Sequence, residues 1–223
     1  MVYRIYGASR EWWGASLTLF GFNYDYQPSV PWVPTRNEVI EYLVTVLRPK
    51  PGDVVYDIGC GDGRVAVTIA SKFPHVRVRC VELRRDLVER ARKLAEEQGV
   101  RGLVDIVEAD FFKVDLRDAN IVYMYLLTSV NQKLRPKLEH ELRIGTLLVS
   151  LDFPIPGWNP VATIELERSW QRVFYIYVRG VSDIGTASEA MEEALRSALR
   201  RLDLEAARRK GANIVISLPQ ISK

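Results

Sequence analysis

The residues with the clearest chemical meaning form a short run at 54–64, VVYDIGCGDGR, in which an apolar segment leads into a glycine-rich turn. Gly59, Gly61 and Gly63 permit a sharp turn and bring the backbone close to a ligand, although glycine-rich loops also occur in dinucleotide-binding folds. Here the third glycine follows the second by two residues rather than three. Asp57, two residues before the first glycine, would repel a pyrophosphate and suits a cationic ligand instead.

Two more acids follow at the ends of predicted strands. Glu82 comes 25 residues after Asp57, where a carboxylate accepts ribose hydroxyls in other nucleotide-binding folds. Asp110 ends the next strand, where it suits an adenine amino group, and Phe111 or Phe112 suits stacking on the ring. Taken alone, Glu82 or Asp110 is explained as well by a surface acid as by a cofactor contact. Together with the loop, the three acids predict S-adenosylmethionine, which carries an ammonium, a sulfonium and an adenosine.

The elements that must position these acids alternate between strand-like and helix-like segments. Such alternation predicts a doubly wound, mostly parallel, seven-stranded α/β sheet of the Rossmann-like kind, which binds ligands at the carboxyl ends of its strands. The last two strands are close enough to form a hairpin. Thr35 and Glu38 have capping-box spacing at the first helix. Predicted helices cover about 35–47, 64–72, 85–98 and 132–142, and strands 53–58, 76–82, 103–108, 119–125, 146–152, 161–167 and 173–179.

Three blocks that differ in composition and hydrophobic pattern indicate the domain organisation. Residues 1–30 are rich in aromatics that alternate with other residues, as in a β extension. Residues 31–180 form the predicted cofactor-binding domain. Residues 181–223 are predicted to form a helix and a strand. One face of that helix is apolar, which predicts packing on its own domain or, alternatively, pairing with a second chain, so that the protein is a monomer or a dimer through its terminal extensions.

Composition excludes several classes of protein. The net charge of +3, from 31 basic and 28 acidic residues, is too balanced to indicate nucleic acid. No apolar run approaches the roughly 18 residues of a membrane span, and the N-terminus lacks the apolar block of a signal peptide, so we expect a cytoplasmic protein. Cys60 and Cys80 fall in predicted core segments, which favours free thiols. With His75 and His140 they show no metal-ligand spacing, so no metal is expected.

Two further segments, VPWVPT at 30–35 and LLTSVN at 126–131, are far more specific than the glycine loop, and GWNP at 157–160 accompanies them. With the loop, they resemble the archaeal broad-specificity protein-lysine methyltransferases, over about residues 30–180. The resemblance implies a class I methyltransferase that moves a methyl group from S-adenosylmethionine to lysine amines of proteins. It also implies that Thr35 and Tyr56, which lie in matching motifs, contribute to the cofactor site. Trp32 stands where the family usually has tyrosine, so an aromatic wall remains without its hydroxyl.

Methyl transfer to lysine mainly requires a neutral amine held in line with the methyl carbon. Lysine has a pKa of about 10.4 in water, and burial beside a sulfonium lowers it, so no strong base is needed. Aromatic walls hold ammonium groups by cation–π attraction. The predicted channel residues are Tyr125 at the end of the fourth strand, Trp32 and Trp158, with Asn131 as a polar neighbour. Core packing explains Tyr123 better than function does.

Other functions stay open from the sequence. Enzymes that methylate base amines resemble one another in an Asn/Asp-Pro-Pro-aromatic run after the fourth strand, where this chain has MYLL at 124–127. This argues against a nucleic-acid substrate, but leaves another RNA position or a small molecule as alternatives. In a different class, the chain would be a non-catalytic S-adenosylmethionine-binding scaffold that assembles through its terminal extensions.

Overall fold

The computed structural model describes residues 32–167, 169–184 and 189–217. The chain divides into two compact units, Met1–Pro31 and Trp32–Lys223. The predicted N-terminal β extension lies outside the described residues, so it stays a prediction. The described residues all belong to the second unit.

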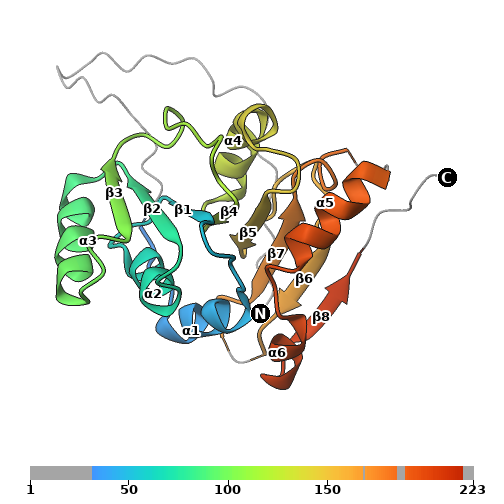
Figure 1. The fold of residues 1–223 in the computed structure, drawn as a ribbon, viewed down its shortest axis with the longest axis horizontal. Coiled ribbons are helices and arrows are strands. Elements are labelled where there is room, and N and C mark those ends of the chain that lie inside the picture. Colours follow the sequence, from blue (N-terminus) through green and yellow to red (C-terminus); the bar gives the residue numbers. More distant parts are fainter. Residues whose placement is uncertain (1–31, 168, 185–188, 218–223) are drawn as a thin grey trace, which may run out of the picture. The chain divides into compact units, whose positions relative to one another are not determined.

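One eight-stranded sheet forms the centre of this unit, in the order β3-β2-β1-β4-β5-β7-β6-β8 (Figure 1). The first five strands are parallel, and β7 enters antiparallel between β5 and β6. The predicted hairpin of the last two strands is thereby confirmed. The strands are β1 Val54–Ile58, β2 Arg77–Glu82, β3 Val104–Glu108, β4 Ile121–Met124, β5 Leu147–Leu151, β6 Ala162–Glu165, β7 Val173–Val178 and β8 Asn213–Ile216.

The helices follow the predicted alternation, with two differences at their starts. α1 begins at Asn37 without a side-chain cap, so the predicted capping box is wrong, because the Thr35 hydroxyl instead bonds to Tyr123. α4 begins at Thr128, one turn earlier than predicted. The helices are α1 Asn37–Val46, α2 Arg64–Lys72, α3 Arg85–Glu97, α4 Thr128–Glu141, α5 Glu189–Leu199 and α6 Leu204–Arg209.

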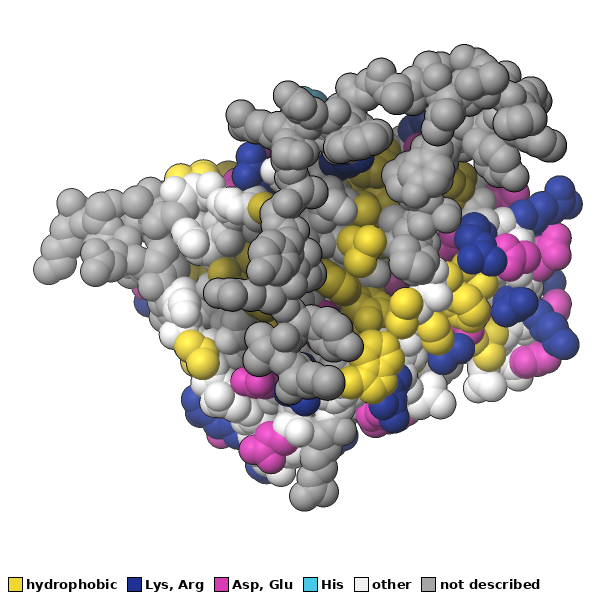
Figure 2. Space-filling view, turned by 180° about the vertical axis from the view of Figure 1, so that it is seen from behind, with side chains coloured by type: hydrophobic (Ala, Val, Ile, Leu, Met, Phe, Trp, Pro, Cys, Tyr) yellow, Lys and Arg dark blue, Asp and Glu magenta, His cyan; other side chains and the backbone are white. Residues whose placement is uncertain are grey.

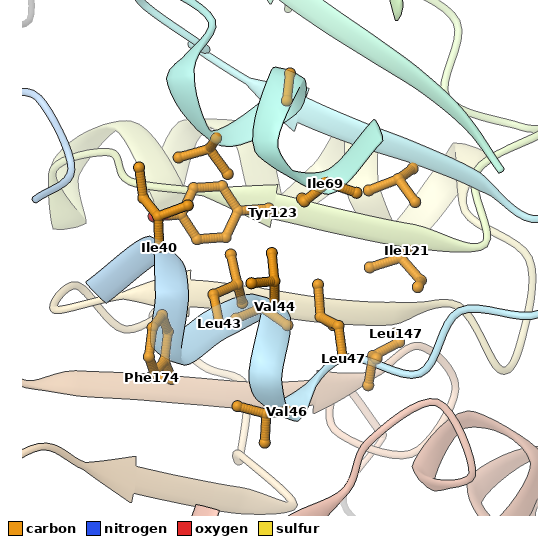
Figure 3. Packing of buried hydrophobic residues seen from close by; sticks show 14 of the residues in the cluster. Ile40, Leu43, Val44, Val46, Leu47, Ile69, Ile121, Tyr123, Leu147 and Phe174 are labelled. Atoms are coloured by element: carbon orange, nitrogen blue, oxygen red, sulfur yellow. The ribbon is translucent and has the colours of Figure 1, made fainter. Parts of the chain in front are cut away.

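The strand period of two divides the core into two layers. Val55 and Asp57 of β1 face the layer built with α1 and α2, whereas Tyr56 and Ile58 face the layer built with α4. In the first layer, the apolar side of α1 faces the sheet, with Ile40 beside Tyr123 of β4, and Leu47, just after the helix, lies beside Leu147 of β5 (Figure 3). Each large side chain buried in this way contributes roughly 1.5–3 kcal/mol. The two layers fix the sheet and therefore the positions of its strand ends.

The C-terminal segment packs on its own unit and extends the same sheet. β8 pairs antiparallel with β6, so the sheet has one strand more than predicted. Leu195 and Ala198 of α5 are buried in the core. Arg201 closes the contact through a nearly buried ion pair with Asp53, with both nitrogen–oxygen distances 2.7 Å. The predicted packing of this helix on its own domain is confirmed. Within the described residues, no helix has the length and apolar character that crossing a membrane requires.

Candidate active site

The glycine loop follows β1 and folds back against β2. The backbone N–H of Gly59 donates to the carbonyl of Val81 at 2.9 Å. Gly61 and Gly63 adopt left-handed φ angles of 57° and 79°, which other residues rarely adopt. A Cβ at Gly63 would lie 2.7 Å from the Cβ of Ala91 on α3. Glycine is therefore required both for the turn itself and for the close approach of α3.

A disulfide joins the glycine loop to β2. Cys60 and Cys80 are bonded, with Cα atoms 5.3 Å apart and a sequence separation of 20. The prediction of free thiols is wrong. Both cysteines are buried as expected, at 7% and 0% exposure, but only the fold of the loop onto β2 brings them within bonding distance. The bond ties the loop covalently to the strand that ends in Glu82.

Asp57 is the buried charge of this site. Its Oδ2 atom is inaccessible and has no hydrogen-bond partner among the described residues. Burial, with the nearby charges of Glu82 and Asp62 and against a hydrogen bond from the backbone of Ala66, raises the pKa of Asp57 to about 8. A buried carboxylate oxygen without a partner is costly, and a cation placed against it removes that cost. The ammonium of S-adenosylmethionine fits this position.

Glu82 lies at the end of the neighbouring strand, where the cofactor prediction places a ribose. Its Oε2 accepts the N–H of Gly61 at 3.0 Å, and its Oε1 accepts the N–H groups of Leu83 and Arg84 at 2.9 Å each. These bonds fix the carboxylate beside the glycine loop. Each carboxylate oxygen has two lone pairs, so Oε2 retains capacity for a hydroxyl donor.

The third predicted acid lies at the same edge of the sheet. Asp110 follows β3 two residues beyond Glu108, the partner of Glu82 in the β2–β3 register. Its Oδ1 accepts the N–H of Phe112 at 3.0 Å, which closes a local turn. The rings of Phe111 and Phe112 lie 4.9 Å apart; Phe111 packs on the α4 layer and Phe112 is more exposed. The structure therefore brings Asp57, Glu82 and Asp110 to the carboxyl ends of three adjacent strands.

Trp32 lies against the glycine loop. A Cβ at Gly61 would clash with Nε1 of Trp32, so the indole touches the loop backbone where only a glycine allows it. The guanidinium of Arg90 lies 5.9 Å from the indole ring centre, within the range of a cation–π contact. Trp32 thus packs directly on the backbone of the glycine loop.

Thr35 connects the segment ahead of α1 to β4. It is buried, and its hydroxyl lies 3.1 Å from the hydroxyl of Tyr123. Tyr123 is paired with Asp57 in the β1–β4 register, so Thr35, Tyr123 and Asp57 lie on one face of the sheet. Arg64 adds a contact to the Thr35 carbonyl at 3.4 Å. Burial raises the pKa of Tyr123, in keeping with its predicted place in the core.

Tyr125 lies just beyond β4, half-buried beside the turn that follows β5. Its ring stacks on Phe153, with ring centres 5.9 Å apart. Burial raises the pKa of Tyr125, a hydrogen bond with Gln171 opposes that shift, and the charge of Asp152 adds to it. Gln171 is fully buried and also binds the segment ahead of α1, donating to the Pro34 carbonyl at 3.2 Å. Gln171 therefore joins Tyr125 to the segment that carries Trp32.

Asn131 supports the same turn from α4. It is fully buried, and its Nδ2 donates to the carbonyls of Phe153 at 3.0 Å and Pro154 at 3.3 Å. Its Oδ1 has no partner among the described residues. Asn131 is thus connected to Tyr125 through the turn that carries Phe153.

Two predicted site residues lie elsewhere. Tyr56 points to the face opposite Asp57, because neighbours in a strand alternate, and its hydroxyl bonds to Asp118 at 2.6 Å. Trp158 is buried in the α4 layer, where it packs edge-on against Tyr177 and donates to Glu139 at 3.0 Å. The structure does not bring Tyr56 into the cofactor site or Trp158 into the target channel; both stabilise the core.

Sequence reasoning missed Gln171 and Asp152. Gln171 lies between two strands of a hairpin, 137 residues from its partner Pro34, and a lone glutamine there carries no local signal. Asp152 was assigned to a strand, yet its backbone has a left-handed φ of 58°. A polar residue at the end of β5, adjacent to the end of β4, was the only available hint.

Comparisons with known proteins agree with this geometry. Residues 57–162 match the family model described as the ANTKMT methyltransferase domain. The chain is 42% identical, over 156 residues, to a protein-lysine N-methyltransferase of Saccharolobus islandicus (strain REY15A), across 70% of this chain and 97% of that protein. It is 36% identical over 169 residues to the adenine nucleotide translocase lysine N-methyltransferase of Mus musculus, across 74% and 72% of the two chains.

A solved structure shares both fold and sequence with the chain. It is described as an RNA methyltransferase from Salinibacter ruber in complex with S-adenosyl-L-homocysteine, and it matches with a TM-score of 0.61 and 40% identity over 66% of this chain and 93% of that one. The fold is therefore that of the class I methyltransferases. The names of the relatives differ in substrate, since two refer to protein lysine and one to RNA.

Proposed function

The chain belongs to the protein-lysine N-methyltransferase family, and from that membership we propose which of its residues carry methyl transfer from S-adenosylmethionine to lysine side chains. One observation carries the proposal: the buried Oδ2 of Asp57, beside the glycine loop, lacks a partner. No packing role explains a lone buried carboxylate oxygen, whereas an ammonium ligand does.

The cofactor side of the site comprises the ends of β1, β2 and β3. Asp57 binds the ammonium, Glu82 accepts the ribose hydroxyls, and Asp110 accepts the adenine amino group while Phe111 lies along the ring. Gly59, Gly61 and Gly63 let the backbone approach. Thr35 supports this side through Tyr123, the register neighbour of Asp57.

The target side comprises the ends of β4 and β5. When bound, S-adenosylmethionine supplies a methyl group on a sulfonium that a neutral amine displaces in line. Tyr125 and Phe153, stacked at 5.9 Å, form an aromatic wall that excludes water from the amine. Trp32 separates the glycine loop from solvent. Exclusion of water lowers the pKa of a lysine amine, so these side chains favour the neutral nucleophile without a strong base.

Asn131 acts on the target side as a positioning residue. Its amide donates to the Phe153 carbonyl at 3.0 Å, which fixes the turn against which Tyr125 stacks. The unpartnered Oδ1 is the part of this side chain that is free to bind a further donor. Loss of Asn131 is expected to misplace Phe153 rather than to remove a reacting group.

Protein is the substrate favoured over RNA by the charge distribution. Nucleic-acid sites gather Lys and Arg on one face. On the face shown in Figure 2, basic and acidic side chains are intermixed toward the margins, and hydrophobic side chains lie nearer the middle. Many of the basic side chains are in ion pairs with acids two to five residues away, for example Arg84 with Asp86. A partner made of protein fits such a surface better than a polyanion does.

Labelling tests the proposal directly. The purified protein is incubated with methyl-labelled S-adenosylmethionine and either a mixture of lysine-rich proteins or total RNA, and the label is located by mass spectrometry. Label on lysine ε-amines is the expected result. Label on RNA alone would overturn the lysine proposal, and absence of label despite measured cofactor binding would favour the scaffold alternative.

Two finer predictions concern assembly and location. Self-association through the terminal extensions is supported by β8, an edge strand of the described sheet in which Val215 and Ile216 are about half exposed. Sedimentation of the wild type against Val215→Lys tests it.

A cytoplasmic location stays a prediction. Disulfides such as Cys60–Cys80 are usual in oxidising compartments, and among cytoplasmic proteins they are usual in those of hyperthermophiles.

A further inference from the structure

A turn with an uncommon backbone follows β5 at the target side of the site. Asp152 has a φ of 58°, and it is the one non-glycine residue with a left-handed φ among the described residues. The N–H of Phe153 donates to the carbonyl of Leu151 at 2.7 Å, which makes Asp152 the central residue of a γ-turn. γ-Turns with a positive central φ are rare and strained. Such strain persists only where surrounding bonds enforce it, and it gathers at functional sites.

Hydrogen bonds from two directions enforce this turn. On the β7 side, the Asp152 N–H donates to the Val173 carbonyl at 2.7 Å, and Asp152 Oδ1 accepts the N–H groups of Arg172 at 2.7 Å and Val173 at 3.1 Å. On the α4 side, the Phe153 carbonyl accepts Ser150 Oγ at 2.6 Å, in addition to Asn131. The turn is therefore fixed at both of its ends.

The charge of Asp152 is more than the turn requires. Oδ1 alone accepts both backbone N–H groups, and an asparagine would supply the same oxygen and tolerate a left-handed φ. Oδ2 has no partner among the described residues. Asp152 is half-buried, so part of its charge is withdrawn from water. A negative charge is thus placed at the end of β5 without a structural need for it.

The surroundings of this charge match an alkyl ammonium. Phe153, the next residue, stacks on Tyr125 with ring centres 5.9 Å apart. The negative charge of Asp152 contributes, after burial, to the raised pKa of both Tyr125 and Tyr123, so it lies within electrostatic reach of both hydroxyls. A carboxylate beside aromatic rings accepts the N–H groups of an amine while the rings contact its methylene groups.

We propose that Asp152 binds the ε-amine of the target lysine, with its Oδ2 accepting an N–H from that amine beside the ring pair of Tyr125 and Phe153. The proposal rests on the lysine methyltransferase function given above and adds a specificity-determining residue to it. The carboxylate accepts an N–H of the neutral amine and stabilises the positive charge that the nitrogen acquires on methylation. The strained turn holds Oδ1 against β7, and in this proposal Oδ2 faces the target side.

Binding measurements with a matched pair of peptides test the proposal. One peptide surrounds a lysine that the wild-type enzyme labels, and the other carries norleucine in its place, which has no amine. Both are titrated into wild type and Asp152→Asn in the presence of S-adenosylhomocysteine. Asp105→Asn, the same change at an exposed acid at the start of β3, is the control, and Asp152→Gly, which adopts the turn without strain, is a second variant.

The expected result is a 10- to 100-fold weaker affinity of Asp152→Asn for the lysine peptide, about the effect of one charge-assisted hydrogen bond. Affinities for norleucine peptide and S-adenosylhomocysteine should be unchanged, and Asp105→Asn should match the wild type. A lysine-peptide affinity within twofold of the wild type, or equal losses for both peptides, would overturn the proposal. Failure of the wild type to label any lysine would instead refute the underlying function.

Discussion

The cofactor side and the target side of this site are built in different ways. The cofactor side gathers Asp57 and the glycine loop within seven consecutive residues, and adds one acid at the end of each of the next two strands. The target side depends on contacts between distant segments, such as Gln171 with Pro34, 137 residues apart, and Asn131 with Phe153. The chain therefore encodes cofactor binding locally and target recognition through the assembled fold.

If Asp57 is the charge of the cofactor side, its largest effect should appear in the stability of the cofactor-free protein. The pKa of Asp57 is about 8 in the folded protein against an ordinary 3.8. Between these values the folded state holds a proton that the unfolded state has lost, so stability falls as pH rises from about 4 to 8. Asp57→Asn does not lose stability in this way. Its free energy of unfolding should therefore exceed that of the wild type by a difference that grows to several kcal/mol by pH 8 and then levels off.

Melting temperatures of both proteins from pH 5 to 9 check this prediction. A constant difference between the two across that range would mean that Asp57 does not titrate as a buried acid. Added S-adenosylmethionine should stabilise only the wild type, because only a carboxylate pairs with the ammonium.

Removal of the same carboxylate should nearly abolish cofactor binding. For Asp57→Ala we expect at least a 100-fold weaker affinity for S-adenosylmethionine, since a charge-assisted hydrogen bond worth about 3 kcal/mol is lost. Calorimetry measures it, with Asp105→Ala as a control at an exposed acid. Tight binding of S-adenosylmethionine by Asp57→Ala would show that the ammonium binds elsewhere.

The disulfide offers a second way to weaken the cofactor side alone. Cys60 and Cys80 close a loop of about 20 residues, and cross-links of this size contribute about 3 kcal/mol. The double variant Cys60→Ala/Cys80→Ala should lose about that much unfolding free energy in urea. Its affinity for the cofactor should also fall, because the glycine loop is no longer tied to β2. Equal stability of the variant and the oxidised wild type would contradict this role.

A change at Tyr125, on the target side, should affect methyl transfer and leave cofactor binding unchanged. Tyr125→Ala removes half of the aromatic wall, and we expect methyl transfer to slow about 10-fold, in the range of one aromatic pair, with unchanged cofactor affinity. Tyr125→Phe separates the ring from the hydroxyl. Tyr42→Phe, whose hydroxyl donates to the Ala207 carbonyl, is the control. Should Tyr125→Ala turn over at the wild-type rate, Tyr125 lies outside the target channel.

The same contrast explains what the sequence could predict. The α/β alternation and the placement of Asp57, Glu82 and Asp110 at adjacent strand ends beside the glycine loop were predictable, because strand period and loop spacing are local properties. Tyr56 and Trp158 were misplaced, since a motif match does not say to which face a side chain points. The Cys60–Cys80 bond and the contacts of Gln171 were not predicted, because each depends on segments that meet only after folding.

A crystal structure of the protein with S-adenosylhomocysteine and a lysine peptide tests the central claim most directly. We expect the cofactor amino group to lie within about 3.2 Å of Asp57 Oδ2, a hydrogen-bond distance, and the peptide lysine to lie at Tyr125 on the other side of the site. An amino group bound away from Asp57, or a peptide lysine remote from the ends of β4 and β5, would contradict the division of the site into these two sides.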